Sequence, residues 1–266
     1  MENCLTNDNV SHAERASIDN RYFYITGDNI GQCTSGLVRN TIAVFLRKLT
    51  GGDTFLKKQW HNMVEYVGGN CSVLGFFVEQ VILSHIEKEG MTMDGIKIPG
   101  MKSVGFRTLP KLPENAGESP VLYIPDAYNY KAIDGLIVSV GVFDELKVLE
   151  IMPIQITINQ NHEDSEKSFF RGWDDFVVKT LGGSDYDILK IVFLWIVENT
   201  ETFPRKDGIV AAKTLTTRNG TYSTPVYERK VRSVGYVSEM VGHKLKMARE
   251  RGKKKMAGEL GRKDRR

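Results

Sequence analysis

The sequence predicts an α/β or α+β fold in which helices flank a mixed β-sheet. Apolar residues recur at helical spacing in the first third of the chain, two long apolar strands separated by a turn follow, and then a further helix and a buried strand. A chain of 266 residues with 41% hydrophobic residues can bury a full core. We expect one domain over 21–242, a disordered N-terminus at 1–20 and a basic, disordered or helical tail at 243–266.

The N-terminal part of the chain is expected to be largely helical, because glycines interrupt stretches with helical apolar spacing. The expected elements are a strand at Arg21–Thr26 and helices at Leu37–Leu49, 55–67 and Val73–Glu87. The segment Gly31–Gly36 has the two-glycine spacing of a phosphate-binding loop, but Leu37 and Val38 stand where Lys and Ser or Thr are needed. We therefore interpret this segment as a loop that enters a helix.

The pattern then changes to that of strands, with a β-hairpin at its centre. The expected elements are short strands and loops over Gly95–Pro120, strands at Val121–Ile124, Ala132–Val140, Val148–Asn159, Ile188–Val197 and Thr221–Val231, a turn at Gly141–Lys147, and helices at Ser165–Leu181 and Ser238–Met247. The longest apolar run, Ile188–Val197, is too short to cross a bilayer, and the polar N-terminus is no signal peptide, so we expect no membrane partner. The three cysteines form no CxxC pair, which argues against a disulfide scaffold or a structural zinc site.

The positive charge of the chain is concentrated at its C-terminus. Residues 243–266 hold eleven Lys and Arg against three acids, a net +8, so the rest of the chain is −5 although the total is +3. Lys253, Lys254 and Lys255, with Arg249 and Arg251, form a pattern typical of nucleic-acid binding or nuclear import. The alternative is a solubilising terminus. No aromatic residue interleaves with these bases, so any binding is expected to be directed at phosphates and to depend strongly on salt.

Polar residues inside the hairpin are the candidates for chemistry. Asp134 lies in an otherwise apolar strand, where a carboxylate is costly to bury unless it is paired or metal-bound. Gln155 and Thr157, two residues apart on the next strand, project from the same face. An acid that faces this polar pair could hold a divalent cation, with Glu79 from the preceding helix as a fourth candidate. The alternatives are a structural acid at Asp134, a polar sheet edge and an exposed helix acid.

These residues resemble the PD-(D/E)XK nuclease-like superfamily, and more narrowly the C-terminal effector domains of Crinkler and retrotransposon-hot-spot proteins. The matching segments are 68–86 (GGNCSVLGFFVEQVILSHI), 121–138 (VLYIPDAYNYKAIDGLIV), 153–165 (PIQITINQNHEDS) and 192–197 (VFLWIV). The resemblance covers roughly residues 60–200, and the order and spacing of the four segments carry it. It implies a single nuclease-like domain over 21–242, with a restriction-endonuclease-like mixed sheet flanked by helices, its core at about 60–200, and a magnesium- or manganese-dependent nuclease activity.

The resemblance implies a role for each residue. Asp134 would be the principal metal ligand and Glu79 would support the metal or a ligand. Gln155 stands at the usual acidic position and Thr157 at the usual lysine position. His162, in the loop after the strand, could contact a phosphate or act as general acid or base.

Two of these positions depart from the family pattern, since Gln offers only a neutral oxygen and Thr no positive charge. Lys131 and Lys167 are candidates to replace the lysine, and Glu150 followed by Met152 is an alternative register. The family also implies DNA, or RNA, as a partner, with nuclear import machinery or host proteins beside it. The expected location is the nucleus or cytoplasm, or a host nucleus after secretion. The alternative function is an inactive fold of this type that binds nucleic acid or protein.

Overall fold

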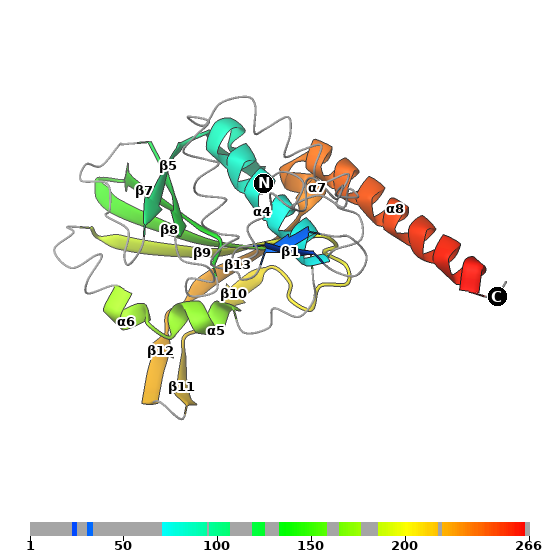
Figure 1. The fold of residues 1–266 in the computed structure, drawn as a ribbon. Helices are drawn as coiled ribbons and strands as arrows, with labels where there is room; N and C mark the ends of the chain where they lie inside the picture. The colour runs from blue at the N-terminus through cyan, green and yellow to red at the C-terminus, as the bar shows by residue number, and fades with distance from the viewer. Residues whose placement is uncertain are drawn as a thin grey trace. The chain divides into compact units, whose positions relative to one another are not determined.

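The computed structural model describes residues 23–25, 31–33, 71–94, 96–106, 119–125, 133–158, 165–176, 186–217 and 220–263. It is an α+β structure with a large mixed sheet and flanking helices (Figure 1), as the sequence predicts. The chain divides into two compact units. Unit 1 comprises Met1–Ile82 and Ser238–Arg266, and unit 2 comprises Leu83–Val237. No helix of these described ranges is long and apolar enough to span a membrane.

Unit 1 contains a small hairpin, the first part of one helix and a long C-terminal helix. The strands β1 (Phe23–Ile25) and β2 (Gly31–Cys33) pair antiparallel, so the loop expected from Gly31 onward begins as a strand. Helix α4 (Cys71–Glu89) confirms the expected helix and continues into unit 2. The two earlier helices, expected at 37–49 and 55–67, and the N-terminus at 1–20 lie outside the described residues.

Helix α8 (Glu239–Lys263) is much longer than the helix expected at Ser238–Met247. Val241, Leu245 and Ala248 are buried at helical spacing, so the first turns of α8 have a packed face. The strongly basic residues follow these turns. The basic tail is therefore helical up to Lys263 and begins from a packed stem.

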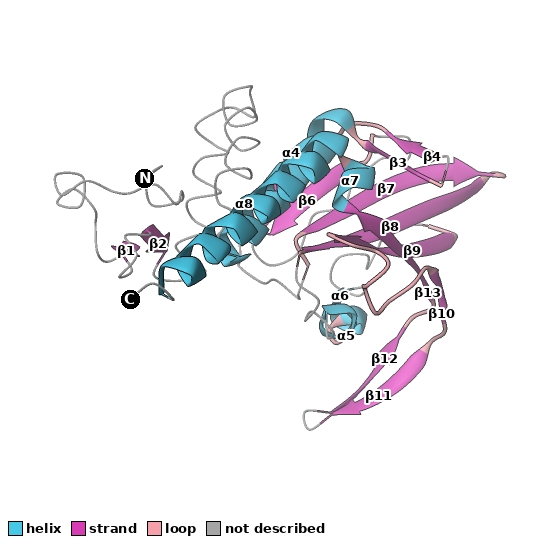
Figure 2. Ribbon diagram, turned by 90° about the vertical axis from the view of Figure 1, so that its right-hand side faces the viewer, coloured by secondary structure: helices cyan, strands magenta, loops and turns pink. Residues whose placement is uncertain are grey.

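The core of unit 2 is a seven-stranded mixed sheet in the order β10-β13-β9-β8-β7-β6-β5 (Figure 2). Its strands are β5 (Lys102–Phe106), β6 (Val121–Pro125), β7 (Gly135–Phe143), β8 (Leu146–Thr157), β9 (Ile188–Val197), β10 (Gly208–Val210) and β13 (Tyr227–Ser233). β7 pairs antiparallel with both of its neighbours, β6 and β8. β9 pairs parallel with both of its neighbours, β8 and β13. Residues 151–158 and 191–197 are all buried, which explains why β8 and β9 read as continuous apolar runs.

The hairpin of β7 and β8 differs from the prediction at both ends. The strands continue to Phe143 and from Leu146, so the turn is only Asp144–Glu145 rather than Gly141–Lys147. Both turn residues have positive φ (49° and 66°), the backbone of a two-residue I′-type turn. At the other end, Asp134 precedes β7 instead of lying within it.

Helix α4 ends at Gly90, as the sequence predicts, and a second small hairpin follows. Gly90 has φ of 73°, and a Cβ there would lie 2.0 Å from the carbonyl oxygen of Ile98, so only glycine fits. The strands β3 (Met91–Met93) and β4 (Ile96–Ile98) pair antiparallel directly after it.

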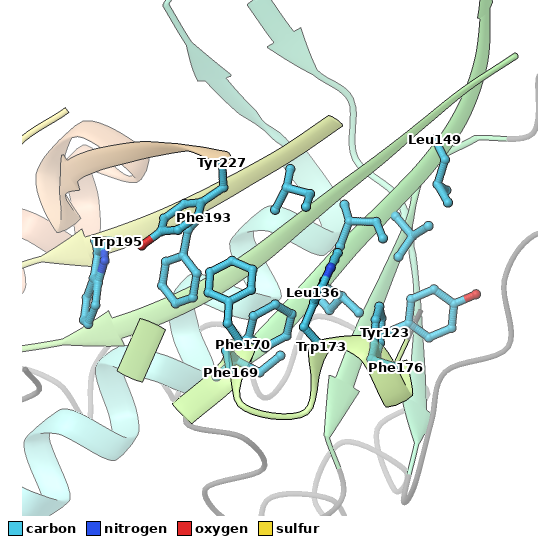
Figure 3. Packing of buried hydrophobic residues seen from close by; sticks show 14 of the residues in the cluster. Tyr123, Leu136, Leu149, Phe169, Phe170, Trp173, Phe176, Phe193, Trp195 and Tyr227 are labelled. Carbon is cyan, nitrogen blue, oxygen red and sulfur yellow. The ribbon is translucent and has the colours of Figure 1, made fainter. Parts of the chain in front are cut away.

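A cluster of aromatic side chains packs on one face of the sheet (Figure 3). Four of its rings come from α5 (Ser165–Phe170) and α6 (Trp173–Phe176), which replace the single helix expected at Ser165–Leu181, and β9 and β13 add Phe193, Trp195 and Tyr227. Arg171 and Gly172 interrupt the helix, since glycine weakens helices, and 177–185 lie outside the described residues. The rings of Phe169 and Phe170 meet at 5.1 Å, and those of Trp173 and Phe176 stack at 5.5 Å. These rings cover β8 and β9 and fix the helices to the sheet.

The single strand expected at Thr221–Val231 is replaced by two strands, β12 (Gly220–Thr224) and β13. β11 (Lys213–Thr217) and β12 (Gly220–Thr224) form a separate two-stranded ribbon, and the chain rejoins the sheet as β13. Pro225 lies between β12 and β13, where it cannot donate a ladder hydrogen bond. The short helix α7 (Val234–Val237) closes unit 2.

Glu166 of α5 is a buried carboxylate held by residues of β9 and β13. Trp195 Nε1 donates to its Oε1 at 2.6 Å, and the Tyr227 hydroxyl donates to its Oε2 at 2.5 Å. Arg229 adds a bidentate pair at 2.6 and 2.5 Å, and Arg205 Nε lies 3.6 Å away. Burial opposes ionisation, but the hydrogen bonds from Arg229, Tyr227 and Trp195 outweigh it and hold the pKa of Glu166 below its usual 4.5.

Glu166→Gln should lower the free energy of unfolding by about 3 kcal/mol at neutral pH, because it leaves the Arg229 guanidinium without its anion. A lowered carboxyl pKa in the folded state stabilises the protein above pH 4.5, and this contribution is lost as the pH falls through the folded pKa. The difference between wild type and variant, measured by urea denaturation, should therefore shrink as the pH falls below about 4.5. Glu201→Gln, at an exposed acid, is the control. A difference that is constant with pH would contradict the ionised state of Glu166.

Candidate functional site

Asp134 and Gln155 meet where β7 begins beside the end of β8. The Asp134 backbone N–H donates to the Ile154 carbonyl at 2.8 Å, which places its side chain over β8. Its Oδ2 accepts from the Ile156 backbone N–H at 2.6 Å and from Gln155 Nε2 at 2.9 Å. The contact that the hairpin predicts is therefore present, although Asp134 reaches it from just before the strand. The carboxylate in this state acts as an acceptor for two β8 donors.

Gln155 is only 5% exposed, and its two amide atoms have different surroundings. Nε2 faces two oxygens, Asp134 Oδ2 and the Ile156 carbonyl oxygen at 3.4 Å. Oε1 has no hydrogen-bond partner and is the one buried side-chain polar atom of the described residues in that condition. A buried carbonyl oxygen without a partner costs about 1–3 kcal/mol. The amide nitrogen thus faces two oxygen atoms, and this orientation leaves the amide oxygen without a hydrogen bond.

Close packing fixes the backbone beside this pair. A Cβ on Gly135, the first residue of β7, would lie 3.0 Å from Leu83 Cδ2 and 3.4 Å from Leu122 Cδ1. Leu83 of α4 and Leu122 of β6 therefore approach β7 at a position without a side chain. This packing fixes the backbone at Gly135, and so the position from which the side chain of Asp134 extends.

Thr157 follows Gln155 on the same face of β8 and is 5% exposed. In register, Gln155 pairs with Trp195 and Thr157 with Val197 of β9. At the position that the sequence resemblance assigns to lysine, the chain thus carries a small, buried hydroxyl group. A cation near Asp134 must come from another residue or from a bound metal.

The remaining site candidates stay predictions. Glu79 is half-buried on the unit 1 part of α4 and accepts a hydrogen bond from Gln80 at 3.1 Å, which does not test its role toward a metal. His162 and Lys131 lie outside the described residues. Lys167 is exposed on α5, the helix that also carries Phe169 and Phe170 of the aromatic cluster.

The alternative register through Glu150 is excluded. Glu150 pairs with Ser139, five positions along β7 from Asp134, or roughly 16 Å away. It forms a cross-strand ion pair with Lys190 at 3.1 Å. Glu150 and Met152 also project from the face of β8 opposite to Gln155, because side chains alternate along a strand.

The basic residues expected to bind nucleic acid lie on α8. Arg251, Lys253 and Lys254 are exposed, Arg249 is half-buried, and Lys255 belongs to the same helix. Arg249 and Lys253 are four residues apart, so they share one side of the helix. The prediction of a patch at this end of the chain thus becomes a basic helix, separate in sequence from the Asp134 site.

Sequence reasoning missed the charged cluster around Glu166. Its partners Tyr227 and Arg229 lie 61 and 63 residues away, and no local pattern indicates such a pairing. Both carboxylate oxygens of Glu166 accept hydrogen bonds, and the bidentate pair with Arg229 is typical of a structural ion pair. We therefore interpret the Glu166 cluster as structural, because both oxygens of its carboxylate have partners, whereas Oε1 of Gln155 has none.

The residues around Asp134 fit a hard divalent cation. A carboxylate, a carbonyl oxygen and an amide oxygen are ligands that Mg²⁺ accepts, with water in its other positions. Turning the Gln155 amide by half a rotation would place Oε1 where Nε2 now lies, beside Asp134, an arrangement that a cation favours. Groups of three or more His, Cys, Asp or Glu that could hold a metal are absent from the part of the chain that the structure describes. The ligand set here includes only one acid, so weak binding is expected.

Gln155→Glu should tighten the binding of Mg²⁺ or Mn²⁺ and destabilise the metal-free protein by about 2 kcal/mol, because two carboxylates would meet without a cation. Melting temperature measured against metal concentration checks both effects. Gln155→Met is the matched control, since it keeps the volume but offers no oxygen and should lose the metal-dependent shift. Equal metal-dependent shifts in wild type and both variants would contradict a site at Gln155.

Comparisons with protein-family models, with curated proteins and with solved structures found no match to this chain.

Proposed function

We propose that this chain is a nuclease-like effector domain of the Crinkler and retrotransposon-hot-spot type, which binds nucleic acid and hydrolyses phosphodiester bonds with a divalent metal at Asp134 and Gln155. The observation that carries the proposal is the buried, unpartnered Oε1 of Gln155, a residue whose other amide atom, Nε2, contacts the Asp134 carboxylate. A polar atom that is enclosed and unsatisfied is rare in proteins and calls for a partner. The resemblance of the four segments supplies the reaction class.

The bound metal, Mg²⁺ or Mn²⁺, would polarise the scissile phosphate and lower the pKa of a bound water. Asp134 would hold the ion by its carboxylate, while the Ile156 N–H keeps that carboxylate in place through its 2.6 Å hydrogen bond. Gln155 would add its amide oxygen after rotation. Trp195, its register neighbour, contributes an apolar wall that limits water beside the site.

A second candidate function is binding without hydrolysis. Thr157 is buried and neutral at the position of the family's lysine, and the Asp134 carboxylate already accepts two hydrogen bonds from β8. These two features favour a fold of this type that recognises nucleic acid or a protein and leaves it intact. A role in the nucleus, either of the producing cell or of a host, is part of both proposals, and the basic helix supports it.

Supercoiled plasmid should be cut by the wild type in the presence of Mg²⁺ or Mn²⁺, and chelation should stop the cutting. Asp134→Ala should reduce the rate by about a hundredfold or more, because it removes the only acid among the proposed metal ligands. Glu201→Ala, at an exposed acid of the same unit, is the control. No cutting by wild type across metals and across DNA and RNA substrates, with nucleic-acid binding retained, would exclude hydrolysis and leave the second candidate.

Replacing Lys253, Lys254 and Lys255 together by Gln should weaken nucleic-acid binding and reduce its salt dependence. The slope of log K against log salt should fall by about 0.9 for each duplex phosphate that the helix no longer neutralises. These positions follow the packed stem of α8, so Leu245 and Ala248 stay in place and the helix should remain folded. Lys97→Gln combined with Lys102→Gln, at exposed lysines of unit 2, is the control. An unchanged salt slope in the triple variant would contradict the role of α8.

A further inference from the structure

The ribbon of β11 and β12 is an excursion from the main sheet. β10 and β13 pair with each other, Val210 with Tyr227, and the chain between them leaves the sheet to form the ribbon. Both views show the ribbon extending beyond the seven strands (Figures 1 and 2). A lone two-stranded ribbon is marginally stable in water, so its retention needs a physical reason.

The root of the ribbon is rigid. Thr224 is 7% exposed, and its hydroxyl accepts from the Lys213 N–H at 3.1 Å and donates to the Lys213 carbonyl at 3.3 Å. Lys213 and Thr224 are also register partners, so this hydroxyl locks the first rung. β12 lies against α5 and α6, and Leu215 and Tyr222 form a half-buried pair. The ribbon is therefore held from one face and at its base.

The other face of the ribbon carries exposed hydroxyl groups. Thr214 and Ser223 are register partners and both are exposed, and Thr221 is exposed on the same side of β12. Alternation along β12, with Thr221 and Ser223 exposed and Tyr222 half-buried between them, separates the two faces. Threonine and serine hydroxyls donate to phosphates and to base edges alike.

The charge of this segment differs from that of the chain around it. Residues 208–227 contain no acid, although the whole chain has 33 acids in 266 residues, and they include the exposed Lys213. Acids return directly on both sides, with Asp207 and Glu228. A protruding element without negative charge is complementary to a polyanion.

We propose that the β11–β12 ribbon enters the major groove of duplex DNA, where its hydroxyl face contacts phosphates and base edges. This inference rests on the proposed function of nucleic-acid binding. The major groove of B-form DNA is about 12 Å wide and admits a two-stranded ribbon, whose strands lie about 4.8 Å apart. The major groove of A-form RNA is deep and too narrow for side-chain contact, so the ribbon selects DNA over double-stranded RNA.

The test compares three variants by their affinity for a DNA duplex and for an RNA duplex of the same sequence. Thr214→Glu adds a negative charge to the hydroxyl face and should weaken DNA binding about tenfold or more, with RNA binding unchanged. Thr202→Glu makes the same change at an exposed turn outside the ribbon and should bind DNA as the wild type does. Thr214→Val with Ser223→Ala keeps strand propensity and removes two hydroxyls, so it tests the face if the acid unfolds the ribbon.

Each outcome decides one question. Equal DNA affinity of wild type and all ribbon variants would overturn the role of the ribbon and leave the proposed function standing. Equal weakening on DNA and RNA would overturn the groove assignment. A wild type that binds neither duplex nor single strands would overturn the proposed function itself.

Discussion

The buried Glu166 carboxylate is the interaction on which the arrangement of unit 2 depends. It lies at the start of α5 and accepts from β9 through Trp195 and from β13 through Tyr227 and Arg229. A carboxylate in this position would be very costly without its partners, so α5 can pack on the sheet only where β9 and β13 present Trp195, Tyr227 and Arg229 to Glu166. The aromatic cluster of α5 and α6 then covers the sheet face that carries Gln155. Helix, strands and candidate site are thus fixed by one set of charged hydrogen bonds.

Much of the sheet could be predicted from the sequence because its central strands are buried on both sides. β9 has the predicted bounds, and α4 extends the prediction by two residues at each end. The predicted bounds of the turn in the central hairpin are wrong, because its two acids adopt positive φ without the Asn-Gly or Asp-Gly sequence that indicates such a backbone. The helix after β8 was predicted too long because its apolar spacing continues across Gly172, where the chain breaks. Periodicity identifies elements better than it identifies their ends.

The candidate site could be predicted only in part, because sequence spacing indicates contacts within one hairpin but not contacts between residues far apart in the chain. Asp134 and Gln155 lie on neighbouring strands of one hairpin, so sequence spacing alone brings them together, and the structure shows the contact. The direction of the contact could not be predicted, because it depends on which amide atom faces the carboxylate. The partners of Glu166 could not be predicted either, because tertiary packing joins them across more than sixty residues. Residues outside the described ranges, His162 among them, keep their predicted roles without a structural test.

The two-residue turn at Asp144–Glu145 has a consequence far from where it lies. Side chains alternate along β8, so the turn length decides which face receives Gln155, about ten residues and roughly 33 Å further along an extended strand. Exposed loop tips usually tolerate insertions. Here, one added residue must be absorbed as a bulge, or else every side chain of β8 changes sides and Gln155 leaves Asp134. The length of this turn therefore sets the register of β8, and with it the face on which each side chain lies. A substitution that keeps the length of the turn leaves that register unchanged.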